Sequence, residues 1–195
     1  YGDSTVMASE LHVDAIKHSG GTSALTIDSA GVVDLSVNNN VTIYGLNANQ
    51  TISSSTPSTI TNWTQLNNQT SFGIKQVGTA MGVSSGVFST SRLGVYRIIT
   101  QLNCYIQSSA VRYIQQDLRF TPNGGSMIAG DYYHSLGYHQ SDYTYGTFTR
   151  LHYYNFNHAN DNVVMQVGCS GTVYLKGSSG YDTFICFEWV APPVA

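Results

Sequence analysis

Apolar and polar residues alternate along most of this chain with a period of two, which is the period of a β-strand. The clearest run spans residues 94–106, where most even positions are apolar and several odd positions are polar. The apolar even positions are Tyr96, Ile98, Leu102, Cys104 and Ile106. Gly, Asn and Ser cluster between such runs, and no stretch has the period of an amphipathic helix. The pattern predicts an all-β protein.

The C-terminal part, residues 61–195, has the longer and more apolar runs. Residues 112–120 and 163–169 each have one apolar face. Residues 183–190 are apolar on both faces, which is typical of a strand that is covered twice. About eight strands with turns at this spacing predict a jelly-roll β-sandwich head.

A strand covered on both faces needs a second cover besides its own core, and we expect a neighbouring subunit to supply it. The candidate residues for this subunit interface are Tyr96, Tyr154, Phe184, Phe187 and Trp189. Charged residues make up only 10% of the chain, against roughly 25% in typical soluble domains. A surface buried against identical neighbours needs less charge for solubility, and charges there would be costly to desolvate. Pattern and composition together predict a homo-oligomer.

The N-terminal part, residues 9–60, has shorter runs, each with two or three apolar residues. So thin a ribbon buries too little surface on its own to offset the entropy of ordering it. Three copies wound around one axis could bury enough, so we predict an extended β-stalk or attachment segment of a homotrimer. Residues 1–8 precede this segment, and we interpret them as an expression remnant followed by a natural start at Met7.

Charge and cysteine usage narrow the range of partners. The net charge is -3 and the eight Lys and Arg residues are scattered, so we expect no nucleic-acid partner. No run approaches the roughly 18 apolar residues of a membrane span, so we expect no membrane insertion. The three cysteines, Cys104, Cys169 and Cys186, form no CxxC motif and each lies in an apolar strand pattern. We predict buried free thiols and folding in a reducing cytoplasm.

No catalytic constellation stands out in the sequence. It lacks the GxSxG, HExxH, P-loop and GxGxxG motifs, and its few acidic residues are scattered. Cys104 lies on the apolar face of its run, which disfavours a nucleophile paired with a distant His. We predict that the protein is not an enzyme.

A stretch rich in Tyr and His, residues 131–145, is the densest candidate binding site. It contains Tyr132, Tyr133, His134, Tyr138, His139, Tyr143 and Tyr145. Exposed rings of this kind stack on sugars, and Asp and Gln can take the hydroxyl hydrogen bonds. One interpretation is a receptor-contact loop, and the other is that these tyrosines pack along the trimer seam. The sequence leaves both interpretations open.

Asp131 and Asp142 lie in the same stretch and, with His134 and His139, could supply metal ligands. Carboxylate oxygens suit calcium, and a three-fold axis would need only one ligand from each chain. No spacing here is diagnostic of a metal site. We therefore expect no cofactor, with calcium on the trimer axis as the alternative.

Two parts of the chain resemble known families, and the first is the head. Residues 86–98 carry Gly-Val-Phe and then Gly-Val-Tyr, which resembles the G-x-F … G-x-Y-x-F pattern of complement-type (one-q) heads in the tumour-necrosis-factor-like superfamily. Residues 180–187 look like that family's closing S-x-F-x-G-F strand, except that Cys186 stands where the family has Gly. The resemblance covers roughly residues 72–190. It implies a jelly roll that assembles as a compact trimer and that binds rather than catalyses.

Residues 11–33 resemble a different group, the L-x-V-D-x-I … A-L-T-I-D-x-x-G-x-V opening of phage tail-fibre and virion proteins, often from marine and cyanobacterial phages. This resemblance implies a virion protein assembled in the host cytoplasm, with the N-terminal segment attached to other virion proteins. We expect a trimeric phage fibre whose head binds a host-surface receptor, either a glycan such as a polysaccharide or a protein. The alternative is a capsid-associated head fibre or decoration protein without a receptor role. A depolymerase is disfavoured because the chain is short and lacks a carboxylate pair.

Overall fold

The chain divides into two compact units, Tyr1–Asn38 and Asn39–Ala195. The computed structural model describes residues 15–17, 23–27, 33–35, 41–66, 81–106, 111, 113–129, 144–177 and 182–194. In these residues the regular structure consists of β-strands and one 3-10 turn, η2 (Pro122–Gly124). The predicted all-β class is therefore confirmed.

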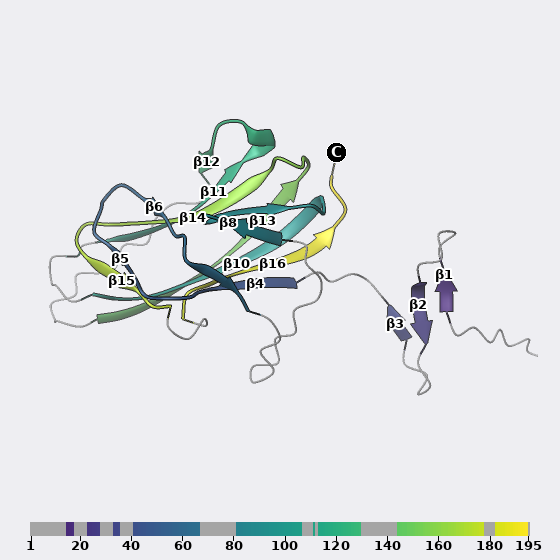
Figure 1. Cartoon of the computed structure of the whole chain (residues 1–195), viewed down its shortest axis with the longest axis horizontal. Helices are drawn as coiled ribbons and strands as arrows, with labels where there is room; N and C mark the ends of the chain where they lie inside the picture. The colour runs from purple at the N-terminus through teal and green to yellow at the C-terminus, as the bar shows by residue number, and fades with distance from the viewer. Residues whose placement is uncertain are drawn as a thin grey trace, which may run out of the picture. The chain divides into compact units, whose positions relative to one another are not determined.

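The smaller unit contains a three-stranded antiparallel sheet in the order β1–β2–β3 (Figure 1). Its strands are β1 (Ala15–Lys17), β2 (Ser23–Ile27) and β3 (Val33–Leu35). Leu25 pairs with Leu35 and Ile27 pairs with Val33. The apolar positions of the predicted ribbon thus fall in register across neighbouring strands.

The larger unit is a sandwich of two antiparallel sheets (Figure 1). In the first sheet the order is β5–β15–β10–β16–β4–β7, and β13 pairs with the other edge of β10. Its strands are β4 (Val41–Leu46), β5 (Gln50–Ile52), β7 (Trp63–Gln65), β10 (Gly94–Ile106), β13 (Thr144–Phe156), β15 (Val173–Leu175) and β16 (Phe184–Ala191).

In the second sheet the order is β12–β11–β14–β9–β8, and β6 also pairs with β14. Its strands are β6 (Ser58–Thr59), β8 (Met81–Ser84), β9 (Val87–Thr90), β11 (Ile114–Thr121), β12 (Ile128–Ala129) and β14 (Asn162–Cys169). The two sheets form a jelly-roll-like sandwich, as the spacing of the apolar runs predicts.

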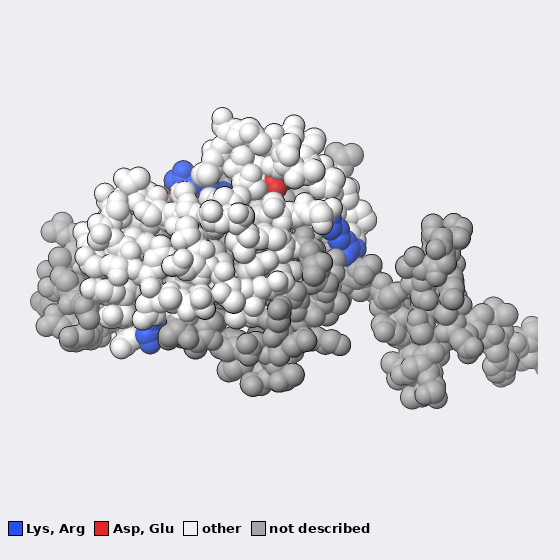
Figure 2. All heavy atoms as spheres, in the orientation of Figure 1, with Lys and Arg blue, Asp and Glu red and all other residues white. Residues whose placement is uncertain are grey.

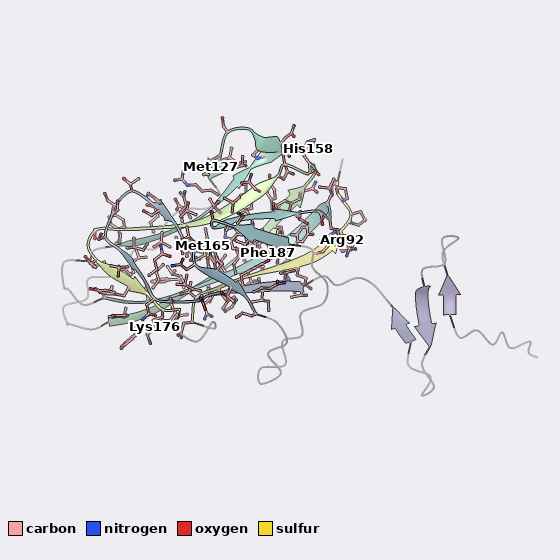
Figure 3. All side chains as sticks on the ribbon, in the orientation of Figure 1. Arg92, Met127, His158, Met165, Lys176 and Phe187 are labelled. Carbon is pink, nitrogen blue, oxygen red and sulfur yellow. The ribbon has the colours of Figure 1, made fainter. Side chains whose placement is uncertain are left out.

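The core lies between the two sheets. The even positions of β10, from Gly94 to Ile106, are all buried, as the alternation predicts. Figure 3 shows Met165 of the second sheet and Phe187 of the first sheet in the space between them. The ring of Phe88, also from the second sheet, lies 5.1 Å from the ring of Phe187, centroid to centroid. Each sheet therefore uses one face for the core.

The boundary between the two parts differs from the predicted one. The sequence predicts a stalk over residues 9–60, but β4, β5 and β6 are strands of the sandwich, and the units divide between Asn38 and Asn39. Strand β4 pairs with β16 and buries Tyr44 and Leu46 in the core. Its run of apolar residues is no longer than those before it, so the alternation alone could not assign it to the head.

Candidate binding surface

The first sheet has one face that is turned away from the core, and this outward face is the candidate interaction surface. Strand register places three rows of residues on it, each crossing β13, β10 and β16. The rows are Thr149–Gln101–Phe184, Leu151–Ile99–Cys186 and Tyr153–Arg97–Glu188. These positions alternate with the core positions along each strand, so they share the outward face. These nine residues are called the outer rows.

The middle of the outer rows is apolar from one strand to the next. Leu151 is 56% exposed, and Ile99 and Cys186 are half-buried. Tyr153 in the adjoining row is 61% exposed. An antiparallel sheet that faces water usually carries polar side chains on that face. An exposed apolar band in this position is a feature of interaction surfaces.

The charges in the outer rows neutralise each other. Arg97 donates from Nε to Oε2 of Glu188 at 2.6 Å, and its Nη2 contacts the same oxygen. The hydrogen bond and the charge of Glu188 raise the pKa of Arg97. Burial, followed by the charge of Glu188, raises the pKa of the neighbouring Cys186 thiol to about 11. Figure 2 shows a described surface that is almost entirely uncharged in that view.

A row of three tyrosines crosses the same sheet at the start of β13. Tyr145 of β13 pairs with Tyr105 of β10, and Tyr105 also pairs with Tyr174 of β15. The ring centroids of Tyr105 and Tyr174 are 4.7 Å apart with an interplanar angle of 14°, and those of Tyr105 and Tyr145 are 6.0 Å apart. Tyr145 is 64% exposed, and the Lys176 ammonium lies 4.8 Å from its ring centroid. These three residues are called the tyrosine row.

A network of polar groups adjoins the tyrosine row. Asn103 donates from Nδ2 to Oδ1 of Asp182 at 3.2 Å, and Gln101 donates from Nε2 to the Asp182 carbonyl at 3.1 Å. The Thr183 hydroxyl donates to the Asn103 carbonyl at 3.1 Å and accepts from the Asn103 backbone N–H at 3.2 Å. The network holds the residues before β16 against β10, so the polar groups beside the row stand in fixed positions.

Tyr145 is the one residue of the predicted receptor site that lies within the described part of the chain. The others, Tyr132, Tyr133, His134, Tyr138, His139 and Tyr143, lie outside it, as do the predicted metal ligands Asp131 and Asp142. The hypotheses about these residues stay predictions.

Sequence reasoning missed the neighbours of Tyr145 in the folded sheet. Tyr105, Tyr174 and Lys176 are far from Tyr145 in sequence and meet it only through the strand register. One signal could have found Tyr105, because it stands at an outward position of the strongest alternating run. No comparable signal marks Tyr174 or Lys176, because β15 is only three residues long.

The predicted interface residues fall into different environments. Tyr96 and Phe187 are 0% exposed and pack in the core, so the prediction that they contact another subunit is wrong. Tyr154 also packs against the core, stacked on Phe120 at 4.2 Å between ring centroids. Trp189 is half-buried under Arg92, whose guanidinium carbon lies 3.8 Å from its ring centroid. Phe184 is half-buried in the outer rows and stays a candidate.

Strand geometry explains why Tyr96 and Phe187 belong to the core. Both residues occupy inward-facing positions of long strands, so their side chains pack into the core of their own subunit. Aromatic character alone does not separate a core residue from an interface residue, because both environments favour large rings.

The described residues bear on catalysis and metal binding in two ways. They contain no group of three or more His, Cys, Asp or Glu side chains that could hold a metal ion. Burial raises the pKa of the Cys104 thiol to about 12, so this thiol is protonated near neutral pH and a poor nucleophile. No helix in the described part of the chain is long and apolar enough to cross a membrane.

No protein-family model and no curated protein matches this sequence. Solved structures do match. Eiger TNF from S. frugiperda is 13% identical, over 81% of this chain and 96% of that chain, with a TM-score of 0.60. Murine APRIL at pH 5.0 is 11% identical, over 77% of this chain and 99% of that chain, with a TM-score of 0.53. At this identity the likeness shows the fold alone, and the predicted jelly-roll fold is confirmed.

Proposed function

We propose that the chain forms the homotrimeric, non-enzymatic binding head of a bacteriophage fibre. The observation that carries the proposal is the apolar middle row, Leu151–Ile99–Cys186, on the outward face of the first sheet. Fully burying an exposed Leu side chain is worth about 1.5–3 kcal/mol, and covering Leu151, which is 56% exposed, recovers about half of that. A second copy of the chain would therefore gain free energy by covering this row.

The tumour-necrosis-factor-like jelly roll supports an assembly of three subunits. The resemblance over residues 72–190 implies a compact trimer, and the matching solved structures share its fold. In such an assembly the outer rows of each subunit would lie against its neighbours. The neutralised pair of Arg97 and Glu188 suits that position, because an unpaired charge would be costly to desolvate there.

The fibre role rests on the resemblance of residues 11–33 to phage tail-fibre and virion proteins. The strands β1, β2 and β3 in this part of the chain belong to a compact unit of their own. A separate small unit suits attachment to other virion proteins. The head would then be available for a host-surface receptor, and the protein would reside in the virion.

Sedimentation equilibrium at micromolar concentration tests the trimer. The full chain is expected at three times its mass of 21.2 kDa. The Leu151→Arg variant is expected as a monomer, because it places an unpaired guanidinium in the middle row. Val87→Arg is the matched control, since Val87 is an aliphatic residue, 36% exposed, on β9 of the other sheet. A monomeric full chain, or a trimer that Leu151→Arg leaves intact, contradicts the proposal.

Binding of the purified trimer to host cells tests the receptor role. A receptor-binding head is expected to bind cells saturably, and excess unlabelled trimer is expected to displace it. A protein that binds phage capsids and ignores cells would instead have the capsid-decoration role.

A further inference from the structure

We infer that the tyrosine row is a carbohydrate-binding site, in which Tyr145 stacks against a pyranose ring. The inference rests on the proposed binding role and deepens it, because it names a glycan as the partner and Tyr105, Tyr145, Tyr174 and Lys176 as the residues that meet it.

Tyr145 offers an open aromatic face. Its side chain is 64% exposed. Its two neighbours, Tyr105 and Lys176, come from β10 and from the end of β15, which both lie on the same side of β13. Among the described strands β13 pairs with β10 alone. These strands therefore leave much of the Tyr145 ring uncovered, and the apolar face of a sugar ring can stack on it.

Polar groups for the sugar hydroxyls stand beside that ring. Each of the three phenol hydroxyls in the tyrosine row can both donate and accept a hydrogen bond. Lys176 adds an ammonium group, for which the described residues supply no carboxylate partner. Asn103 and Thr147 pair with each other on the same face, two residues from the tyrosine row. One open ring surrounded by donors and acceptors suits a polyol better than an apolar peptide.

The site is held in place before any ligand arrives. Tyr105 stacks on Tyr174, and both residues belong to strands of the sandwich. The hydrogen bonds of Asn103 to Asp182 and Thr183 fix the adjoining row. A tyrosine side chain has two rotatable torsions and loses little entropy when a ligand covers it. Groups that are positioned in advance leave more of the contact free energy for affinity.

The tyrosine row is separate from the surface proposed for trimer formation. On the same strand, Thr149 is the residue of the outer rows nearest to Tyr145 and follows it by four positions, which corresponds to about 14 Å along an antiparallel strand. A trimer that closes over the outer rows does not have to cover Tyr145.

Saturation-transfer NMR on the full chain tests the inference. The probes are the methyl pyranosides of glucose, galactose, mannose and N-acetylglucosamine, each titrated separately. At least one is expected to give saturable transfer, with a Kd of about 1 mM. Tyr145→Ala is expected to weaken that binding by about tenfold or more, whereas Tyr145→Phe keeps the ring and stays within about threefold.

His158→Ala is the matched control. His158 is an exposed ring in the turn after β13, and Figure 3 shows it at the opposite end of the larger unit from Lys176. This variant is expected to bind the probe as the unmodified chain does. Saturable transfer from none of the probes, or equal binding by Tyr145→Ala, overturns the inference.

Sedimentation and cell binding on the same samples separate this inference from the proposed function. A trimer that binds host cells but none of the glycosides overturns the carbohydrate site alone. A monomer that binds a glycoside through Tyr145 overturns the trimeric head and supports the carbohydrate site.

Discussion

Gly94 fixes the path of the chain at the start of β10. Its φ is +147°, a region that favours glycine. A Cβ atom there would lie 2.3 Å from Nε1 of Trp189 and 2.4 Å from the carbonyl oxygen of Ala191. Two residues later, the Tyr96 hydroxyl donates to the carbonyl of Arg92 and anchors the preceding turn. The G-x-Y pattern that resembles complement-type heads therefore serves the fold and not the binding surface.

Replacing Gly94 is expected to destabilise the head. Gly94→Ala should lower the free energy of unfolding by about 2–4 kcal/mol. The new Cβ would collide with a backbone oxygen, and alanine would be held at a strained φ. Urea unfolding at one fixed protein concentration measures the change. Gly82→Ala is the control, since the nearest atom to its Cβ would be 3.9 Å away, and it should change stability by less than about 0.5 kcal/mol. Equal losses in both variants would contradict the explanation.

At the scale of whole strands, the sequence pattern predicts the position of a strand and its core-facing side when these depend on that strand alone. The predicted run 94–106 coincides with β10, because one face of that strand is buried along its whole length. The pattern did not show that the polar face of β11 is buried as well. Gln115 is 8% exposed and Asp117 is 0% exposed. What covers a strand from above is set by distant parts of the chain, and a local alternation carries no information about it.

The polar face of β11 is possible because its neighbours along the strand satisfy the buried carboxylate of Asp117. Gln115 donates from Nε2 to both carboxylate oxygens of Asp117 at 2.9 Å, and Arg119 donates to Oδ2 at 3.2 Å. These partners alternate along one strand, so the charge of the buried carboxylate is compensated locally. The tyrosine row differs from this local arrangement, because its members come from three different strands. No single run of the sequence therefore reveals it.

The turns at one end of the sandwich are joined by one carboxylate, and this link can be tested. Asp161, which is 2% exposed, accepts from the backbone N–H groups of Asn123 at 2.6 Å, Asn157 at 2.6 Å and His158 at 2.9 Å. Asp161→Asn replaces one acceptor oxygen by an NH2 group that faces a donor. We expect a loss of about 2–3 kcal/mol of unfolding free energy in urea. Asn160→Ala, at an exposed neighbour, should leave stability nearly unchanged, and a similar loss there would count against the link.

At the scale of the whole molecule, the two units have different reasons to associate with other copies. The strands of the smaller unit contain three to five residues, and a sheet of such strands buries little surface by itself. The larger unit has its own core, and its reason to associate is the apolar middle row. The scarcity of charge in the sequence agrees with both, because surfaces between identical copies do not need charge for solubility.

Two truncations test where the head begins. A chain that starts at residue 39 keeps every described strand of both sheets, so it should unfold in the same cooperative thermal transition as the full chain. A chain that starts at residue 61 loses β4, β5 and β6, and with them the buried side chains of Leu46, Ile52 and Ile60. Removing one such side chain costs about 2–5 kcal/mol, and domains of this size have only about 5–15 kcal/mol of stability. The shorter chain should therefore show no cooperative transition by circular dichroism. A cooperative transition in it would support the boundary near residue 60 that the alternation predicts, and an unfolded longer chain would mean that the head depends on the smaller unit.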